Sequence, residues 1–552
     1  MKKLLLPALL ACAVAAATPV APVSAQTVCP AAPATVAISG SITSNTTWTS
    51  NNIYLLNGFV FVENGAVLTI EPGTIIKGDK PSKGTLIIKQ GGRIEANGTA
   101  ARPIVFTSNL PVNSRARGDW GGLILCGRAP VNQAGTPTIE GGVGAVYGGT
   151  DPNDNSGTLR YVRIEFPGIA FQPNSEINGL TMGGVGAGTT IDYVQVAYSG
   201  DDSFEWFGGT VNAKHLIAIA ATDDDFDTDF GFQGKVQYGL VLREPNSADV
   251  SGSTAFESDN DAAGSTLTPR TAPVFSNITA ILPNPIGVTA NFTRAIHLRR
   301  NTSISIFNSV LTGWPQGLTL DGSAVQANAT GGTLVLKNNV MAGMGNPYTQ
   351  QSGGTFDVQG FWLNSGNTTL PASSDLGLNA DNFRVTGTCS NAPCVPDLAL
   401  PAGSVLNTGA SFADAKLADA FFNKTGTFRG AFGRTTNWAA GWSNFNPQTT
   451  CYNRPGFTLA AKPAASDQVQ GLSVAPNPTA GAAMLSFDLK RADAATVRVV
   501  DALGRQVAII EAGRLGAGLQ QLALPSSLKN GVYMATITTN ETSQMVRFVV
   551  AK

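Results

Sequence analysis

The stretch "YVQVAYSGDDSFE" at residues 193–205 recurs as "HLIAIAATDDDFD" at residues 215–227. At this offset of 22 residues, the apolar positions, a pair of aspartates and a Phe-acid step coincide. Alternating apolar residues bounded by Gly, Asn and Asp predict short strands separated by turns. Strands that recur once per coil are typical of a parallel β-helix, in which each coil buries its apolar side only against its neighbours.

The repeat extends in both directions and defines two rows of strands. One row contains "YVQVAY", "HLIAIA", "QYGLVL", "VFSNITAIL", "ISIFNSVL" and "LVLKNNVM", and the other contains "SFEWF", "DFDTDF", "FESDND", "AIHLRR" and "GLTLDG". In the first row Asn277, Asn308 and Asn338 align at one corner, where stacked amides can hydrogen-bond from coil to coil. We therefore predict an all-β chain with a right-handed parallel β-helix over residues 26–345, its coils beginning near residue 40.

The composition narrows the possible partners. The chain has 552 residues, with 36 Lys and Arg against 37 Asp and Glu, and only 13% of its residues are charged. A typical globular protein has about 25% charged residues. The near-zero net charge therefore argues against nucleic acid or an anionic membrane as a partner.

The N-terminus reads as an export signal. "MKK" supplies the positive end, "LLLPALLACAVAAA" the apolar segment, and "VSA" before Gln26 a cleavage site, so residues 1–25 are a predicted signal peptide. Cleavage at Cys12, as in a lipoprotein, stays open as an alternative. No later segment reaches the roughly 18 apolar residues that span a bilayer, so we expect no transmembrane segment in the mature chain.

Five cysteines follow the predicted cleavage site: Cys29, Cys126, Cys389, Cys394 and Cys451. Cys389 and Cys394 are close enough in sequence to close one loop, and an odd number leaves one cysteine free or paired elsewhere. The spacing matches no zinc pattern.

The chain after the β-helix divides into three parts. Residues 346–455 have no regular pattern, and we expect them to cap the open end of the helix, where terminal coils need cover. Residues 456–470 contain the linker "AAKPAASDQVQ". Residues 471–552 read as a small β-sandwich of about seven short alternating strands.

The aspartates of the repeat gather on one predicted face. If Phe226 and Phe230 point inward, strand alternation turns the acids beside them outward, and the same parity applies to the neighbouring strands. The predicted outward carboxylates are Glu205, Asp225, Asp227, Asp229, Glu257, Asp259 and Asp261. Carboxylates on strands about 4.8 Å apart repel by about 1 kcal/mol per pair in water and by more where water is displaced, so some group must compensate.

Three interpretations of this face stay open. The first is a solvated acidic surface that Arg299 neutralises at its edge. The second is a site for Ca²⁺, which takes 6 to 8 oxygen ligands, although no EF-hand loop is present. The third is a catalytic site in which His297, Arg299, Glu257 and Asp227 supply acid, base or cation contacts. A second oxygen-rich loop, "DPNDNSG" at residues 151–157, is another candidate metal ligand or an ordinary turn.

The C-terminal part resembles the sorting domains of proteins exported by the type IX secretion system of Bacteroidetes. The resemblance rests on "PNP" at 476–478, the Asp501–Arg505 segment of pattern D-x-x-GR, "NGVY" at 530–533 and the terminal "RFVVAK". It implies that residues 471–552 bind the type IX machinery. It also implies passage through the periplasm to the medium or the outer-membrane surface.

The body, with "GDDSFEWFGGTV" and "DDDFDTDFGFQGKVQYGLV", is similar to secreted bacterial β-helix proteins of unassigned activity. "GDD" at 200–202 also resembles polygalacturonases, but the Gly-His-Gly and Arg-x-Lys motifs of that family are missing. We therefore expect a secreted or cell-surface module that binds calcium, extracellular glycan or both. The alternative is a calcium-dependent polysaccharide lyase or a glycoside hydrolase.

Overall fold

A computed structural model describes most of the chain. The described residues are 29, 31, 33–172, 175–283, 287–350, 354–383, 396–435, 437–456, 468–501, 505–539 and 543–552. The predicted signal peptide and the Cys389/Cys394 pair lie outside them.

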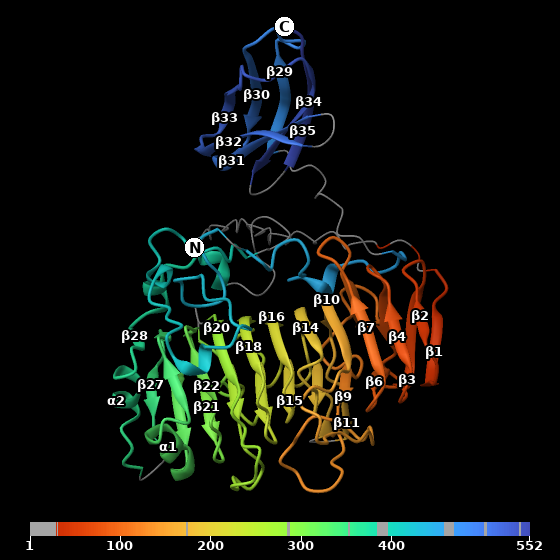
Figure 1. The fold of residues 1–552 in the computed structure, drawn as a ribbon, viewed down its shortest axis with the longest axis vertical. Helices are drawn as coiled ribbons and strands as arrows, with labels where there is room; N and C mark the ends of the chain where they lie inside the picture. Colours follow the sequence, from red (N-terminus) through yellow and green to blue (C-terminus); the bar gives the residue numbers. More distant parts are fainter. Residues whose placement is uncertain are drawn as a thin grey trace, which may run out of the picture.

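The body of the chain is a parallel β-helix. In Figure 1 its strands stand nearly upright, side by side, and the stack of coils extends across the view. The predicted all-β class is confirmed, and the coils pair in parallel register. The stack begins with β1 (Val36–Ile42), which pairs with β3 (Ile53–Val62). The sequence predicted two rows of strands, and the structure contains a third. The longer strands bend at a corner, so their two halves belong to different rows.

One row passes through the first half of β3 and the second halves of the later long strands, β10 to β20. Its members after β3 are β5 (Ile75–Gly78), β8 (Ile104–Ser108), β10 (Gly157–Glu165), β14 (Thr190–Ala197), β16 (Asn212–Ile219), β18 (Lys235–Leu242), β20 (Val274–Ile281), β23 (Val310–Thr312), β26 (Val340–Ala342) and β28 (Thr368–Leu370). The row through the first halves of β10 to β20 adds β2 (Thr46–Trp48), β4 (Val67–Ile70), β7 (Arg93–Asn97), β22 (Ser305–Phe307) and β25 (Val335–Lys337).

The remaining row carries the acidic residues, and we call it the acidic row. After the second half of β3, its members are β6 (Thr85–Ile88), β9 (Leu123–Cys126), β13 (Leu180–Gly183), β15 (Phe204–Phe207), β17 (Phe226–Asp229), β19 (Phe256–Ser258), β21 (Arg294–Arg299), β24 (Gln316–Asp321) and β27 (Asn346–Thr349). A separate antiparallel pair, β11 (Ala170–Gln172) and β12 (Ser175–Glu176), lies outside this stack.

Aromatic side chains fill the interior beneath the acidic row. Phe204, Trp206, Phe226 and Phe256 are all fully buried, as the alternation predicted. The ring of Phe226 lies 5.8 Å from that of Phe204 and 5.6 Å from that of Phe256, measured between ring centroids. Each coil therefore buries its apolar side against the next coil, and the acids between these aromatics must face outward.

The C-terminal end of the stack is closed by short helices. α1 (Ser323–Thr330) follows β24, and α2 (Val358–Leu363) inserts the fully buried Trp362 into the same core as the coils. β27 and β28 belong to the parallel sheet, so the stacking continues past residue 345. No helix in the described part of the chain is long and apolar enough to cross a membrane.

Residues 396–435 and 437–456, which we call the strap, run along the side of the coils. The side chains of Asn277 and Asn308 donate to backbone carbonyls of the strap at Phe428, Gly430 and Ser411. These two corner amides therefore anchor the strap, a role that the predicted ladder of stacked amides did not foresee. A disulfide between Cys29 and Cys451 joins the strap to the start of the chain, and Cys126 is free and buried.

The C-terminal part folds as a sandwich with its own core. One antiparallel sheet has the order β29 (Val469–Ala475), β30 (Ala483–Leu489), β33 (Gly518–Leu524). The other has the order β32 (Gln506–Leu515), β31 (Asp493–Asp501), β34 (Gly531–Thr539), β35 (Ser543–Val550). Leu485, Val497 and Ile537 are buried between the sheets, apart from the core of the coils.

The stacked interior gives a prediction for stability. Replacing the fully buried Trp206 by alanine should destabilise the β-helix by about 3–5 kcal/mol, because it removes the ring and leaves a cavity among four other aromatic rings. Scanning calorimetry should show a lower midpoint for the unfolding of the coils. Val250→Ala is the control, since Val250 is 88% exposed and its truncation should change stability by at most about 0.5 kcal/mol. Equal midpoints for the two variants would contradict the packing argument.

Candidate functional site

Carboxylates from consecutive coils form a ladder on the outer side of the acidic row. The register pairs Glu205 with Asp227, Asp227 with Glu257, and Glu257 with His297. Because the neighbouring side chains Phe204 and Phe226 point into the core, these acids occupy equivalent outward positions on β15, β17 and β19. The parallel register thus stacks one acid above the next.

The turns before β15 and β17 add four aspartates to the ladder. Asp201 and Asp202 precede β15, and Asp223 and Asp224 occupy the same places one coil later. The Asp202 carboxylate accepts the backbone N–H of Asp224 at 2.7 Å, and the Asp224 carboxylate accepts the backbone N–H of Thr254 in the following coil. These bonds from coil to coil orient both aspartate side chains along the stack.

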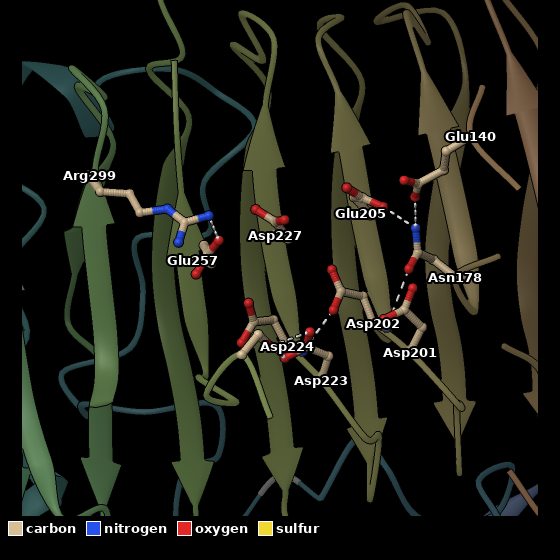
Figure 2. A pocket seen from close by; sticks show the side chains of 11 residues that line it. Glu140, Asn178, Asp201, Asp202, Glu205, Asp223, Asp224, Asp227, Glu257 and Arg299 are labelled. Carbon is tan, nitrogen blue, oxygen red and sulfur yellow. Dashed lines mark hydrogen bonds and ion pairs between the residues drawn. The ribbon is translucent and has the colours of Figure 1, made fainter. Parts of the chain in front are cut away.

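The ladder has a wall at each end, visible in Figure 2. At one end Glu140, from the loop over β9 and β13, accepts from the side chain of Asn178 at 2.9 Å, and Asn178 also donates to Glu205. At the other end the Arg299 guanidinium pairs with Glu257 and Asp259. Between them lies a cavity of about 260 Å³, here called the acidic pocket. Its lining residues are Glu140, Asn178, Asp201, Asp202, Glu205, Asp223, Asp224, Asp227, Ser251, Glu257 and Arg299.

The carboxylate oxygens are close enough to share cations. Three groups each have one oxygen per residue within 4.8 Å of the others: Asp201, Asp202 and Asp223; Asp202, Glu205 and Asp227; and Asp224, Asp227 and Glu257. Asp202 and Asp227 each belong to two groups, so the groups form one continuous chain of ligands. An all-carboxylate donor set fits hard cations such as Ca²⁺, Mg²⁺ or Mn²⁺ rather than Zn²⁺ or Cu²⁺.

One oxygen of the ladder has no other role in the described structure. Oδ1 of Asp227 is buried and has no hydrogen-bond partner among the described residues. A buried carboxylate oxygen without a partner loses its hydration and gains nothing in return, unless a proton or a cation occupies the position next to it. Asp227 lies in the middle of the ladder, where two of the groups meet.

Burial and mutual repulsion make these acids hard to ionise. Loss of hydration, and then the charges of neighbouring carboxylates, raise the pKa of Asp202, Glu205, Asp224 and Asp227 well above the ordinary range. Burial is also the main reason that the pKa of Asp223 rises to about 6. Without a cation, the ladder therefore holds protons more strongly than ordinary carboxylates do.

The structure brings together three of the seven carboxylates named from the sequence: Glu205, Asp227 and Glu257 line the acidic pocket. Asp225 does not point outward as predicted. It is fully buried and its Oδ1 lies 3.1 Å from Nη1 of the equally buried Arg243. Asp225 precedes β17, where the chain still turns, so strand alternation does not extend to it.

The other three acids lie beyond the pocket. Asp229 accepts the N–H of Phe230 at 2.6 Å, and burial raises its pKa to about 7. Asp259 pairs with Arg299 and Arg300, and Asp261 accepts the N–H groups of its own loop. These acids hold neighbouring chain segments in place.

The basic residues named from the sequence are held in ion pairs. Nδ1 of His297 lies 3.3 Å from Glu257, and Nε2 lies 3.2 Å from Asp321. Carboxylates around Arg299 outweigh its burial and raise the pKa of the guanidinium above its ordinary value, so it keeps its proton. Arg299 thus neutralises the end of the ladder, and His297 lies between two of the carboxylates there.

Five acids of the pocket were missed at the sequence level: Glu140, Asp201, Asp202, Asp223 and Asp224. The four aspartates had a signal, because the Asp pair recurs at the same 22-residue offset as the strands. Glu140 comes from a loop that does not repeat, so no sequence signal pointed to it. In the "DPNDNSG" loop, Asp151 and Asn155 accept N–H groups two residues on, as in an ordinary turn.

Both the β-helix and the C-terminal part of the chain match models of known protein families. Residues 40–376 match the model of the pectate-lyase-like beta helix domain, and residues 473–551 match that of the secretion system C-terminal sorting domain. The sorting domain marks a protein that type IX secretion exports to the medium or the cell surface. No curated protein matches the chain.

Solved structures with some similarity include two phage tailspikes. The Dettilon tailspike protein gp208 is 10% identical with a TM-score of 0.21, and the match covers 60% of this chain and 62% of the tailspike, less than two thirds of its length. The enzymatically active domain of tailspike protein 2 from bacteriophage CBA120 is 11% identical with a TM-score of 0.22, over 91% of this chain and 72% of that domain. At these scores the likeness says nothing about function. The family-model match over residues 40–376 covers more than half of the chain and does decide the family: the chain belongs to the pectate-lyase-like β-helix proteins.

Proposed function

We propose that this exported protein binds Ca²⁺ in the acidic pocket and, through the cation-loaded face, an extracellular glycan. The buried and unpartnered Oδ1 of Asp227 carries the proposal, because it lies where two groups of carboxylates meet. Asp202, Glu205, Asp224 and Glu257 would complete the ligand set around it.

A divalent cation accounts for the energetics of the ladder. Two carboxylates repel by about 1 kcal/mol at 4 Å in water, and by about 4 kcal/mol where the effective dielectric constant is near 20. Protons relieve this repulsion only by neutralising the acids one at a time. One Ca²⁺ offsets two charges and uses 6 to 8 oxygens, which suits a pocket lined almost entirely by carboxylates.

Glycan binding would follow from the charge and the location. Acidic polysaccharides are repelled by the bare pocket, but a bound cation can bridge a protein carboxylate and a carboxylate of the ligand. Extracellular calcium modules typically bind with dissociation constants of about 10⁻⁴–10⁻³ M, matched to extracellular calcium. The sorting domain places the pocket in that environment.

Hydrolysis is the second candidate function, and one observation favours it. Oxygens of Asp202, Glu205 and Asp227 lie within 4.8 Å of one another, and burial raises the pKa of all three acids well above the ordinary range. A protonated acid beside an ionised one is the arrangement that glycosidases use to protonate a leaving oxygen and to attack the sugar or activate water. A lyase with Arg299 as base has less support, because the ion pairs of Arg299 keep it protonated.

The first test concerns the cation. Millimolar Ca²⁺ should raise the melting temperature of the full chain, with about 2.7 kcal/mol of added stability at 100 times the dissociation constant. Asp227→Asn should weaken Ca²⁺ binding at least about tenfold in isothermal titration calorimetry, because it removes a charge shared by two ligand groups.

Asp261→Asn is the matched control for that test. It removes the same charge from the same row of strands, but Asp261 caps its own loop and does not line the acidic pocket. Its Ca²⁺ affinity should equal that of the unchanged chain. The cation proposal fails if Ca²⁺ produces no heat and no thermal shift, or if both variants lose affinity equally.

The raised pKa values predict the direction of the pH dependence. The pKa of Asp223 rises from 3.8 to about 6, and those of Asp225 and Asp229 rise to about 7, in each case chiefly through burial. Folding thus favours the protonated forms. In the cation-free chain, the stability that these three groups contribute is fully present below about pH 4 and is lost as pH rises through about 6 to 7.

Ca²⁺ needs ionised ligands, so the thermal shift that it causes should grow between about pH 5 and pH 8. Melting curves with Ca²⁺ and with a chelator across this range measure both trends. A shift that shrinks as pH rises would argue against carboxylate ligands.

The sorting domain gives a test of export. In the native host, deletion of residues 471–552 should leave the protein in the periplasm, because the segment that binds the type IX machinery is missing. Fractionation and immunoblotting of medium, surface and periplasm measure the outcome. Appearance of the truncated protein in the medium at the normal level would show that another segment directs its export.

A further inference from the structure

A second hollow lies on the acidic row beyond the acidic pocket, and nothing in the cation site uses it. It has a volume of about 500 Å³ and lies between the loop at residues 133–138 and the loop at residues 261–267. Phe230 lines it directly after the end of β17, the strand that carries Asp227 into the acidic pocket. At about 3.4 Å per residue, the two positions are about 10 Å apart along one strand. We call this space the apolar hollow.

Phe230 has a left-handed backbone conformation, and the residues at the equivalent position in the two preceding coils are glycines. The register pairs Gly183 with Phe207 and Phe207 with Asp229, so the next residues, Gly184, Gly208 and Phe230, share one corner. Their φ angles are +56°, +69° and +49°. For a bulky side chain this left-handed conformation costs about 1–2 kcal/mol, a cost that glycine does not have.

The space around that corner excludes a side chain at the two glycines, whereas the ring of Phe230 has room and packs 5.7 Å from that of Phe207, between ring centroids. A Cβ atom on Gly184 would lie 2.6 Å from the backbone nitrogen of Gly148, and one on Gly208 would lie 2.5 Å from the side chain of Val131. The covering loop reaches this corner too, since the backbone N–H of Asn132 donates to the Phe230 carbonyl at 2.9 Å, and the side chain of Phe230 lies half-buried at the edge of the apolar hollow. A smaller or more permissive residue would turn this corner with less strain. Backbone strain at a half-buried aromatic residue that lines a cavity is a reason to propose a function for it.

The walls of the hollow are held rigidly. Asn260 is fully buried and donates to the carbonyls of Ser265 and Leu267, which fixes the 261–267 loop. Asn132 donates to the carbonyl of Asn260 at 2.7 Å and ties the opposite loop to the same point. Asp261, which the sequence suggested as a metal ligand, caps the loop instead by accepting from Ser265. The hollow is therefore formed before any ligand arrives.

The lining fits a sugar ring. Phe230, Pro137 and the 50% exposed Leu267 offer an apolar surface, while Gln133, Thr138 and Asp261 place polar groups around it. One aromatic face with a few polar groups suits a pyranose, whose faces are apolar and whose edge carries hydroxyls. The hollow lies at the end of the strand that carries Asp227, so neighbouring units of one polysaccharide can occupy both the hollow and the proposed cation site.

We propose that the apolar hollow is a sugar-binding subsite, in which Phe230 stacks on one pyranose ring of a polysaccharide that runs along β17 from the acidic pocket. This inference rests on the proposed glycan binding and adds the subsite and the direction of the ligand. Phe230 determines affinity there, and its strained backbone is the cost of placing an aromatic ring at that corner.

The test uses Phe230→Gly in the full chain, with Phe230→Tyr as the conservative partner. Binding to a panel of soluble neutral and uronate-containing polysaccharides is measured by affinity electrophoresis in the presence of Ca²⁺. For a polysaccharide that binds the unchanged chain, Phe230→Gly should lower the affinity about tenfold or more, and Phe230→Tyr should preserve it. The melting temperature of Phe230→Gly should stay the same or rise, because glycine relieves the left-handed strain.

Each outcome separates the subsite from its alternatives. A lower melting temperature with unchanged glycan affinity would make Phe230 a packing residue and overturn the proposal, as would the absence of binding to every polysaccharide. Dimers of the unchanged chain that Leu267→Ala converts to monomers in light scattering would assign the hollow to a second copy. Ca²⁺ titration of Phe230→Gly should match that of the unchanged chain, so loss of the subsite is distinguishable from loss of the cation site.

Discussion

The parallel register between coils is the constraint on which the rest of the structure depends. Backbone pairing places Phe204, Phe226 and Phe256 above one another, and the same pairing stacks Glu205, Asp227 and Glu257 on the other side of the sheet. Strands in register lie about 4.8 Å apart, a spacing that suits stacked aromatic rings and strains stacked charges. The core and the site are therefore two faces of one geometry, and a shift of one residue would exchange them.

Partners at the edges of the carboxylate ladder reduce the electrostatic repulsion there. Arg243, fully buried, pairs with Asp225 below the turn that presents Asp223 and Asp224. Arg299 ties Glu257 to Asp259 at one end, and Asn178 holds the other. In the middle of the ladder, Oδ1 of Asp227 has no such partner among the described residues, and the pKa values of Asp202 and Asp227 rise well above their ordinary range. The protein thus pairs the acids at the edges with Arg299 and Asn178 and leaves the centre without such a partner, which is where we propose that a cation binds.

The corners matter as much as the strands. Residues with left-handed backbones turn the chain between rows, and they include Tyr193, His215, Asn277 and Asn308 as well as many glycines. These side chains leave the strand alternation, so they can contact the strap: Asn277 and Asn308 donate to its backbone, and His215 packs edge-on against Trp438. At the corner of the acidic row, the same freedom turns Phe230 out of the core and into a cluster with Phe207.

The sequence by itself determined the β-helix, the sorting domain and the outward direction of Glu205, Asp227 and Glu257, because an in-register repeat and strand alternation are local properties that survive stacking. It did not determine Asp225 or Phe230, since alternation ends where a corner turns the backbone. The strap and the Cys29–Cys451 link join segments far apart in the chain, and periodicity carries no information about such contacts. Only the tertiary structure brought Glu140 and the turn aspartates to the pocket, because a loop and two turns converge there only after the coils are stacked.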